Sequence, residues 1–343
     1  MTKRITIIDV AREAGVAISS VSAALNGGPG VSEATRVRVR ETADRLGWVP
    51  SVRGRNLSSK QSYAVGLVLQ RPVAVLELDP FFAAFIGGVE SVLAPAGYAL
   101  LLQVSAGADA GVQRLRTLAK SGGVDGVFLT DVGVDDPRFP LLDELGLPGV
   151  AINAPGSGRV SSVTQDHEAG LRQLMEYLVG LGHRDIAHVA GTPGLVHSEE
   201  RERVWRAVLE AAGLPADRRI PGDFTSEAGA RAADTLLGGN SAPTAVVCAN
   251  DLTAFGFLSR AQAIGVRVPD DVSVTGFDGV LLGEYVHPPL TTVSTSPAAL
   301  GRRSAEVLLA SVNGAPRTDE WIEPAAVVLR SSVAAPRQAR SPR

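Results

Sequence analysis

Residues 6–16 read Thr-Ile-Ile-Asp-Val-Ala-Arg-Glu-Ala-Gly-Val, a pattern that predicts a short capped helix. The Thr6 hydroxyl and the Asp9 carboxylate have the spacing of a capping box, which satisfies free amides at the start of a helix. Apolar residues follow at helical spacing. Gly15 ends the helix because glycine tolerates a left-handed backbone.

Two further helices are predicted directly after this one. The second runs from about Ile18 to Leu25, and a third lies between a cap at Ser32 and a stop at Gly47. Two short helices joined by a tight turn and followed by a third are typical of a helix-turn-helix domain. The residues expected to face its interior are Val10, Ala11, Ala14, Val21, Ala24, Leu25, Val39, Ala43 and Leu46.

Charge is distributed unevenly along the chain. Residues 1–62 contain ten Lys and Arg and five Asp and Glu, which gives +5; the whole chain carries −3, so the remainder carries −8. A basic head on an acidic body favours binding to nucleic-acid phosphates. The alternative is a three-helix cap without a ligand, which the helix spacing allows but the charge disfavours.

Length and composition limit the class of protein. A chain of 343 residues has room for two or three domains, and no apolar run reaches membrane-spanning length. Because the N-terminus shows no apolar signal region, we expect a cytoplasmic protein without a membrane segment. The single cysteine, Cys248, excludes an intramolecular disulfide framework.

The sequence contains no recognisable motif of an enzyme or cofactor site. Gly-x-Ser-x-Gly, His-Glu-x-x-His and Walker motifs are absent, and the histidines lack metal-ligand spacing. We therefore expect a protein that is not an enzyme and has no catalytic residue, metal or cofactor. The histidines, interpreted as mostly surface or structural, are His167, His183, His188, His197 and His287.

From Tyr63 onward the sequence alternates between predicted strands and helices. Residues 64–69 form a near-continuous apolar run, as in a buried parallel strand, and a helical stretch follows from Phe81 to Ala94. The alternation restarts after about Ser162. Two such sets predict a doubly wound α/β fold in two lobes, with a ligand cleft beyond the carboxyl ends of the strands.

Several stretches resemble lac-repressor (LacI) family transcription regulators. In the head these are residues 6–16, Ser20-Val21-Ser22-Ala23-Ala24-Leu25-Asn26, residues 31–33 and residues 46–50. In the body they are residues 79–82, 181–187, 249–251, 274–278 and 289–293. The resemblance spans about residues 5 to 330. It implies a helix-turn-helix head and a periplasmic-binding-protein-like core whose chain crosses between lobes near Ser161, Thr292 and Trp321.

The resemblance also implies the domain boundaries. Because the tail has no leucine heptad, we expect a homodimer, which suits a pseudo-palindromic operator. The expected parts are a head at 1–50, a hinge helix or linker at 51–61, a core at 62–330 (N-lobe about 62–161 plus 293–321, C-lobe about 162–291 plus 322–330) and a disordered tail at 331–343.

For DNA binding, the family inserts a hinge leucine into the minor groove, and Leu57 holds that position here. Gly54 replaces the usual alanine and weakens a hinge helix by up to ~1 kcal/mol. The base-reading positions include Ile18 and Ala23, which can contact only apolar groups such as a thymine methyl. We therefore expect DNA deformability to carry much of the specificity. The implied DNA-binding residues are Thr6, Ile18, Ser19, Ser20, Ser22, Ala23, Asn26, Arg53, Arg55 and Leu57.

For the effector, the resemblance implies a set of polar and aromatic residues in the cleft. Directed hydrogen bonds and aromatic walls suit a neutral polyol better than a phosphate, because no Gly-rich phosphate cradle is present. The implied effector-binding residues are Phe82, Asn153, Arg201, Phe224, Asn250 and Asp278.

Each of these residues also has a plainer interpretation. Asp278 can simply cap a turn, Arg201 can pair with Glu199 or Glu200 on a solvated face, and Phe82 can belong to the core. Asp251 is expected to organise the end of its strand.

The hypothesis is a DNA-binding repressor whose operator affinity is controlled by a small sugar between the lobes. An alternative within the family is a nucleobase or nucleoside that acts as a corepressor. A solute-binding protein and an enzyme on the same scaffold are less favoured, because the head is basic and catalytic motifs are missing.

Overall fold

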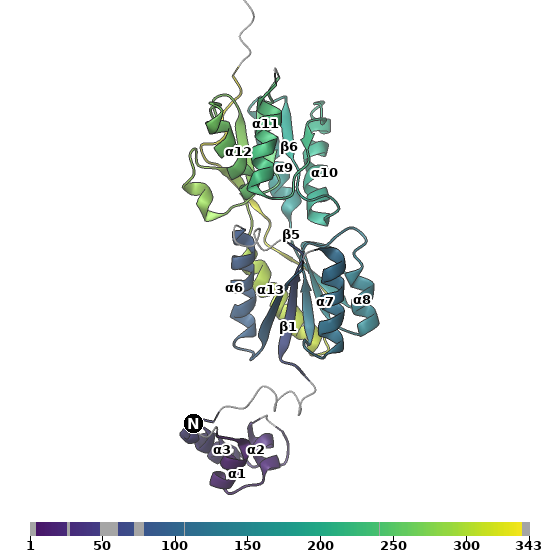
Figure 1. Ribbon diagram of the computed structural model, residues 1–343, viewed down its shortest axis with the longest axis vertical. Helices are drawn as coiled ribbons and strands as arrows, with labels where there is room; N and C mark the ends of the chain where they lie inside the picture. The colour runs from purple at the N-terminus through teal and green to yellow at the C-terminus, as the bar shows by residue number, and fades with distance from the viewer. Residues whose placement is uncertain are drawn as a thin grey trace, which may run out of the picture. The chain divides into compact units, whose positions relative to one another are not determined.

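The computed structural model describes residues 5–25, 28–48, 61–71, 79–105, 107–239 and 241–337. The chain forms two compact units, Met1–Tyr63 and Ala64–Arg343. Figure 1 shows that the first is helical and that the second contains two sheets flanked by helices. The expected hinge at 51–61 falls outside the described residues except for Gln61, and so do the candidate DNA-binding residues Asn26, Arg53, Arg55 and Leu57.

The first unit consists of α1 (Ile7–Ala14), α2 (Ile18–Leu25) and α3 (Glu33–Leu46). The Asp9 carboxylate accepts hydrogen bonds from the Thr6 amide at 2.9 Å and the Thr6 hydroxyl at 2.7 Å, so the predicted capping box is formed. Gly15 ends α1 with φ +64°, as its left-handed role requires.

The core of the first unit contains all nine of the residues predicted to face inward. Seven are buried, and Leu25 and Leu46 pack against them while remaining partly exposed. Arg36 joins two helices, since its guanidinium donates to the carbonyls of Ala23 at 3.3 Å and Gly28 at 2.5 Å. These contacts fix α2 against α3 and leave the other side of α2 exposed.

The first sheet of the second unit has the strand order β11-β5-β4-β3-β1-β2, and its strands are all parallel. Helices cover both faces, as the apolar strands predicted. The strands are β1 (Ala64–Leu69), β2 (Ala99–Val104), β3 (Gly126–Leu129), β4 (Gly149–Ile152), β5 (Val160–Gln165) and β11 (Asp319–Ile322). The helices are α6 (Pro80–Leu93), α7 (Ala108–Lys120), α8 (Arg138–Leu145) and α13 (Pro297–Val312).

The second sheet has the order β12-β10-β9-β8-β6-β7, with only β12 antiparallel to its neighbour among the pairs described. Helices pack against this sheet as they do against the first, and together they form the second lobe. The strands are β6 (Ile186–Val189), β7 (Arg219–Ile220), β8 (Ala245–Cys248), β9 (Ser273–Asp278), β10 (Thr291–Ser294) and β12 (Ala326–Val328). The helices are α9 (His167–Gly180), α10 (Val196–Ala211), α11 (Ser226–Leu237), α12 (Asp251–Ala263) and a short 3-10 turn, η1 (Leu281–Glu284).

The chain passes between the two sheets three times. The first crossing follows Gln165 rather than Ser161, and the second follows Ser294 rather than Thr292, because β5 and β10 continue to pair within their own sheets. The third lies between Ile322 and β12.

Gln165 ties the three crossing segments together. Its side-chain amide donates to the carbonyl of Glu323 at 2.9 Å, and its amide oxygen accepts from the backbone of Ser296 at 3.0 Å. One buried side chain from the first crossing therefore holds the second and third.

The expectation of a disordered tail is wrong for its first residues. Ser332 is fully buried, its hydroxyl donates to the carbonyl of Val274 at 2.6 Å and it accepts from the amide of Thr291 at 2.8 Å. The carbonyl of Ala334 accepts from Ser273 at 3.1 Å. These hydrogen bonds order the segment despite its composition; residues 338–343 lie outside the described residues.

Candidate functional site

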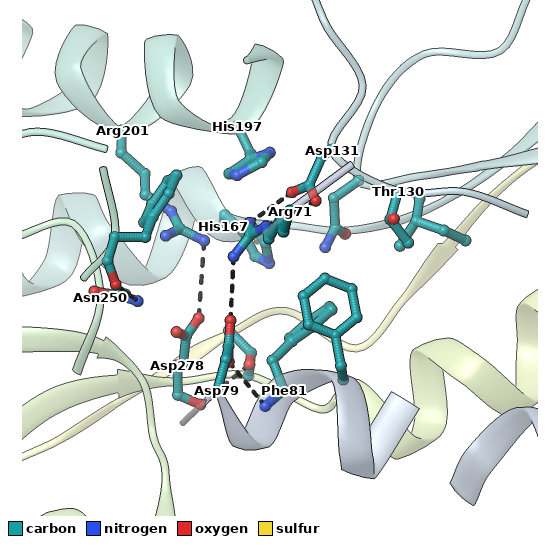
Figure 2. A pocket seen from close by; sticks show the side chains of 15 residues that line it. Arg71, Asp79, Phe81, Thr130, Asp131, His167, His197, Arg201, Asn250 and Asp278 are labelled. Carbon is teal, nitrogen blue, oxygen red and sulfur yellow. Dashed lines mark hydrogen bonds and ion pairs between the residues drawn. The ribbon is translucent and has the colours of Figure 1, made fainter. Parts of the chain in front are cut away.

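A small cavity lies where the carboxyl ends of strands from both lobes converge. Figure 2 shows Arg201 and His197 reaching it from one side and Asp79 and Phe81 from the other. Its volume is about 50 Å³, space for one or two water molecules. The lining residues are Arg71, Asp79, Phe81, Phe82, Thr130, Asp131, Ile152, Asn153, His167, His197, Arg201, Phe224, Asn250, Asp278 and Thr295. All six predicted effector residues are among them.

Arg201 projects from α10 into this cavity and is buried. Its guanidinium donates to the carbonyl of Ala249 at 2.5 Å and lies 3.7 Å from the centroid of the Phe277 ring. Another of its nitrogens is 3.9 Å from the Asp278 carboxylate. The alternative of a solvated pair with Glu199 or Glu200 is therefore wrong, because the side chain points inward instead.

Asp278 ends β9 with an unusual backbone, φ +115°. Burial raises the pKa of its carboxyl well above the ordinary value, although the nearby Arg201 charge acts in the opposite direction. Its carbonyl, rather than its side chain, accepts hydrogen bonds from Thr295. The carboxyl group is thus directed at Arg201 and the cavity and is not used as a simple turn cap.

Asn250 and Asn153 line the cavity while also organising the backbone. The oxygen of Asn250 caps α12 by accepting from the amide of Thr253 at 2.9 Å, and its nitrogen donates to the carbonyl of Phe224 at 3.1 Å. The oxygen of Asn153 accepts from the amide of Gln165 at 3.0 Å. Both amides are therefore rigidly oriented.

The aromatic candidates contact the charged groups of the site. Phe82 is buried in the core of the first lobe and also lies under Arg71, whose guanidinium carbon is 5.2 Å from the ring centroid. Phe224 lies between Arg71 at 5.4 Å and Arg201 at 5.8 Å, and stacks on His197 at 5.4 Å. The core interpretation of Phe82 and its place in the cavity wall are both correct.

Arg71, Asp79 and Asp131 form an ion-pair cluster that the sequence did not reveal. Arg71 donates to both Asp131 oxygens, at 2.5 and 2.8 Å, and to Asp79 at 3.2 Å. Burial opposes ionisation of Asp131, but the Arg71 charge and hydrogen bonds prevail and lower the pKa of that carboxyl. For Asp79 burial prevails and the pKa is raised.

Two histidines interpreted as surface or structural also reach the cavity. Burial, reinforced by the Arg201 charge, lowers the pKa of His197 to about 3 and that of His167 well below its ordinary value. Both rings are therefore neutral at physiological pH, each with one nitrogen able to donate and one able to accept. Asp251, by contrast, accepts from Thr292 at 2.6 Å and Val280 at 2.8 Å, which confirms its structural role.

Unsatisfied polar atoms concentrate at this cavity. Among the buried side-chain atoms described, five lack a hydrogen-bond partner, and three of those belong to the lining: the Thr130 hydroxyl, His167 Nε2 and Arg201 Nε. A buried polar group without a partner costs about 1–3 kcal/mol. Because all three belong to residues that line one cavity, they are candidates for contact with water or with the polar groups of a ligand.

Unfavourable backbone conformations concentrate there as well. Six non-glycine residues in the described ranges have positive φ, and four of them line the cavity: Asp131, Asn153, Phe224 and Asp278. Each such conformation costs on the order of 1–3 kcal/mol and persists where the surroundings impose it, commonly at ligand sites.

Some cavity residues that were not predicted from the sequence could have been found by their position after a strand. Thr130 and Asp131 directly follow β3, just as Asn153 follows β4, so the rule that ligands bind beyond strand ends would have found them. Arg71 also lies just after its strand, β1, but the sequence does not predict which carboxylate it pairs with. His197 lies in the first turn of α10 and gave no signal by spacing.

In the first unit the exposed face of α2 carries the predicted base-reading positions. Ile18 is 48% exposed, Ser19 is exposed, and Ser20, Ser22 and Ala23 are partly exposed. A large aliphatic side chain this exposed on a short helix is available for contact with another molecule. Thr6, in contrast, is engaged with Asp9.

Comparisons with known proteins agree with both units. A family described as "Bacterial regulatory proteins, lacI family" matches residues 6–51, and "Periplasmic binding protein-like domain" matches residues 175–333. The HTH-type transcriptional regulator CelR of Thermobifida fusca is 35% identical over 336 residues, 96% of each chain. This chain belongs to the lacI family of regulators.

Other lacI-family proteins give the same picture. The transcriptional repressor PurR of Vibrio parahaemolyticus is 34% identical over 310 residues, 89% of this chain and 91% of PurR. The solved complex of CelR with cellobiose has a TM-score of 0.73 at 33% identity and covers 96% of this chain and 100% of that one. The lac repressor dimer bound to operator and the anti-inducer ONPF has a TM-score of 0.80 at 26% identity, covering 97% and 100%.

Membership of the lacI family makes this chain a DNA-binding transcription regulator and not an enzyme. It confirms the expected fold, a helix-turn-helix unit followed by a two-sheet periplasmic-binding-protein-like core. Within the described ranges, no helix is long and apolar enough to cross a membrane.

Proposed function

We propose that this regulator is a repressor whose affinity for operator DNA changes when a neutral sugar binds in the cavity between the two lobes. The observation that carries the proposal is the set of unsatisfied atoms, Thr130 Oγ1, His167 Nε2 and Arg201 Nε, around one cavity. A ligand with several hydroxyl groups can accept from the arginine and both donate to and accept from the other two.

The charge of the lining supports a neutral ligand. Arg71 already pairs with Asp131 and Asp79, and Arg201 lies 3.9 Å from Asp278, so both arginines have acidic partners within the protein before any phosphate binds. The rings of Phe82 and Phe224 provide apolar walls for the C–H faces of a sugar. The CelR–cellobiose complex adds support, because that similar protein is bound to a disaccharide.

The small volume of the cavity supports a link between binding and conformational change. Ligand sites commonly measure about 300–1,000 Å³, whereas this cavity measures about 50 Å³. A sugar must therefore displace side chains such as Arg71 or separate the lobes. Because the three crossing segments meet at Gln165, a movement of one lobe relative to the other would bend the chain there.

For DNA binding we propose a homodimer on a pseudo-palindromic operator, with residues 1–50 as the head, 51–61 as the hinge and 62–330 as the core. Ile18, Ser19 and Ala23 of α2 would face base edges, with Ser20 and Ser22 beside them. Arg53, Arg55 and Leu57 of the hinge would contact the minor groove. The +5 charge of residues 1–62 supports this role.

The test combines effector binding with operator binding. Purified protein is screened by thermal shift against mono- and oligosaccharides, and the hits are added to a complex with operator DNA followed by fluorescence anisotropy. We expect a sugar to stabilise the protein and to change its operator affinity at least fivefold, a typical allosteric coupling. If nucleobases or nucleosides give the effect and sugars do not, the corepressor alternative replaces this proposal.

A further inference from the structure

A second, larger cavity opens beside the first. Its volume is about 570 Å³, which lies in the usual range for ligand sites. Asn153 lines both cavities, so the two lie next to each other at this residue. The wall from the first lobe includes Val134 and Trp321, and the wall from α10 includes Glu199, Glu200 and Arg203.

The wall from the first lobe carries two large apolar side chains that are open to solvent. Trp321 lies on the edge strand β11 and is 69% exposed, and Val134 is 60% exposed. Tryptophan is usually well buried, as Trp205 is here. An exposed indole at the mouth of a ligand cavity provides a flat surface for the apolar face of a ring and a donor N–H at its edge.

The opposite wall is polar. The Glu199 carboxylate accepts from the amide of Gly194 at 2.9 Å, and Arg203 pairs with Glu168 at 2.7 Å. Among the described residues no hydrogen bond engages the Glu200 carboxylate, which is only partly exposed. A hydroxyl group placed between Trp321 and α10 would find an acceptor there.

We propose that this second cavity is a subsite for a further sugar ring, with Trp321 as its stacking platform, and that the effector is an oligosaccharide of at least two rings. The inference rests on the proposed function, since it assigns the first ring to the cavity at Arg201 and Asp278. One ring would hydrogen-bond beside Arg201, and the next would pass Asn153 and lie over the indole. The outer cavity already has room for a sugar ring, whereas the inner one must open, as proposed above, before it can hold the first ring.

The experiment titrates the full-length protein with glucose, cellobiose, cellotriose, maltose and maltotriose by calorimetry. We expect at least one oligosaccharide to bind more tightly than glucose, and Trp321→Ala to weaken that oligosaccharide roughly tenfold, or ~1.4 kcal/mol. The affinity for glucose should not change. Trp321→Phe keeps an aromatic ring and should retain most of the affinity.

Two measurements make the test specific. Tyr285→Ala is the matched control, because Tyr285 is 75% exposed and does not line the cavity, so its removal should leave all affinities unchanged. The indole fluorescence should shift to shorter wavelength with the oligosaccharide, and the shift should disappear in Trp321→Phe. Trp205, being fully buried, should not contribute to it.

The two proposals fail in different ways. If an oligosaccharide binds and needs Arg201 but is indifferent to Trp321→Ala, or if glucose binds as tightly, the subsite is wrong and the proposed function stands. If no sugar in the series binds, the subsite falls together with the proposed sugar effector.

Discussion

The guanidinium of Arg201 lies against the ring of Phe277, with its central carbon 3.7 Å from the ring centroid. The two residues come from α10 and β9, on neighbouring parts of the second lobe. The ring supports one face of the cation, and the carbonyl of Ala249 fixes one of its nitrogens at 2.5 Å. The plane of the guanidinium is therefore set before any ligand arrives, and its Nε has no hydrogen-bond partner among the described residues.

Arg201→Lys should abolish the effector response and leave operator binding in the absence of effector within about twofold. Lysine keeps the charge but loses the planar fork that stacks on Phe277 and donates in fixed directions. We expect effector affinity to fall more than tenfold, or ~1.4 kcal/mol or more. Calorimetry with the effector and anisotropy with operator DNA measure the two effects. Arg206→Lys, on the same helix but outside the lining of both cavities, is the control; an equal loss there would contradict the assignment.

Asp131→Ala should lower the free energy of unfolding by ~3 kcal/mol, because it removes the carboxylate that accepts two hydrogen bonds from the buried Arg71 and leaves the longer pair with Asp79. Urea denaturation measures the change. Arg71→Ala combined with Asp131→Ala should lose less than the sum of the single variants, since the two groups interact directly. Additive losses, or a loss no larger than that of the exposed Asp217→Ala, would show that the pair is not coupled.

Stability should decline as the pH falls from about 6.5. Burial lowers the pKa of His188 to about 4, so the unfolded chain binds a proton in this range that the folded chain does not. His188 alone accounts for up to ~3 kcal/mol, lost progressively between pH 6.5 and 4. Burial also lowers the pKa values of three other histidines, His167, His183 and His197.

Asp251 partly offsets this trend. Burial raises the pKa of Asp251 to about 6. The protonated carboxyl therefore stabilises the folded state at low pH, and this stabilisation is lost as the pH rises from the ordinary aspartate pKa toward 6. Urea unfolding at pH 5, 6, 7 and 8 measures the net slope. His188→Phe keeps a ring against Trp205 and should flatten the curve; an unchanged slope would show that His188 does not titrate on unfolding.

Gly191→Ala should reduce effector affinity more than tenfold while the protein still folds. A Cβ at Gly191 would lie 2.1 Å from the tip of the Phe224 ring, so the ring must leave the position in which it lines the cavity. Calorimetry and a melting curve separate the loss of binding from the loss of stability. Gly180→Ala, where a Cβ meets open space in a helix, should bind normally and gain stability. Normal effector binding by Gly191→Ala would show that Phe224 is not part of the effector site.

Leu57→Ala should lower operator affinity and make binding less sensitive to the sequence of the central base step. The reason is that Ile18 and Ala23 offer only apolar contacts, which leaves much of the discrimination to DNA bending at the hinge. Anisotropy with single-base operator variants measures this at a fixed salt concentration. A steep dependence on a guanine opposite Ala23, with an indifferent central step, would overturn the hypothesis.

The head was predictable from sequence because its signals are local. Thr6 and Asp9 cap a helix across three residues, and Gly15 and Gly47 stop helices by their own backbone freedom. The alternation of apolar strands and helices likewise predicted two doubly wound lobes. Arg201, Asn250 and Asp278 were placed in the cavity by resemblance to the family, not by any local rule.

Only the tertiary structure decided which distant residues meet. Arg71 and Asp131 pair across 60 positions because the sheet places β1 beside β3, an order that no local pattern contains. Ser332 is ordered because partners on β9 and β10 satisfy its hydroxyl, whereas its own neighbours predicted disorder. Helix caps and strand periodicity depend on neighbours in the chain, but a buried charge or hydroxyl is stable only where the folded chain brings its partner.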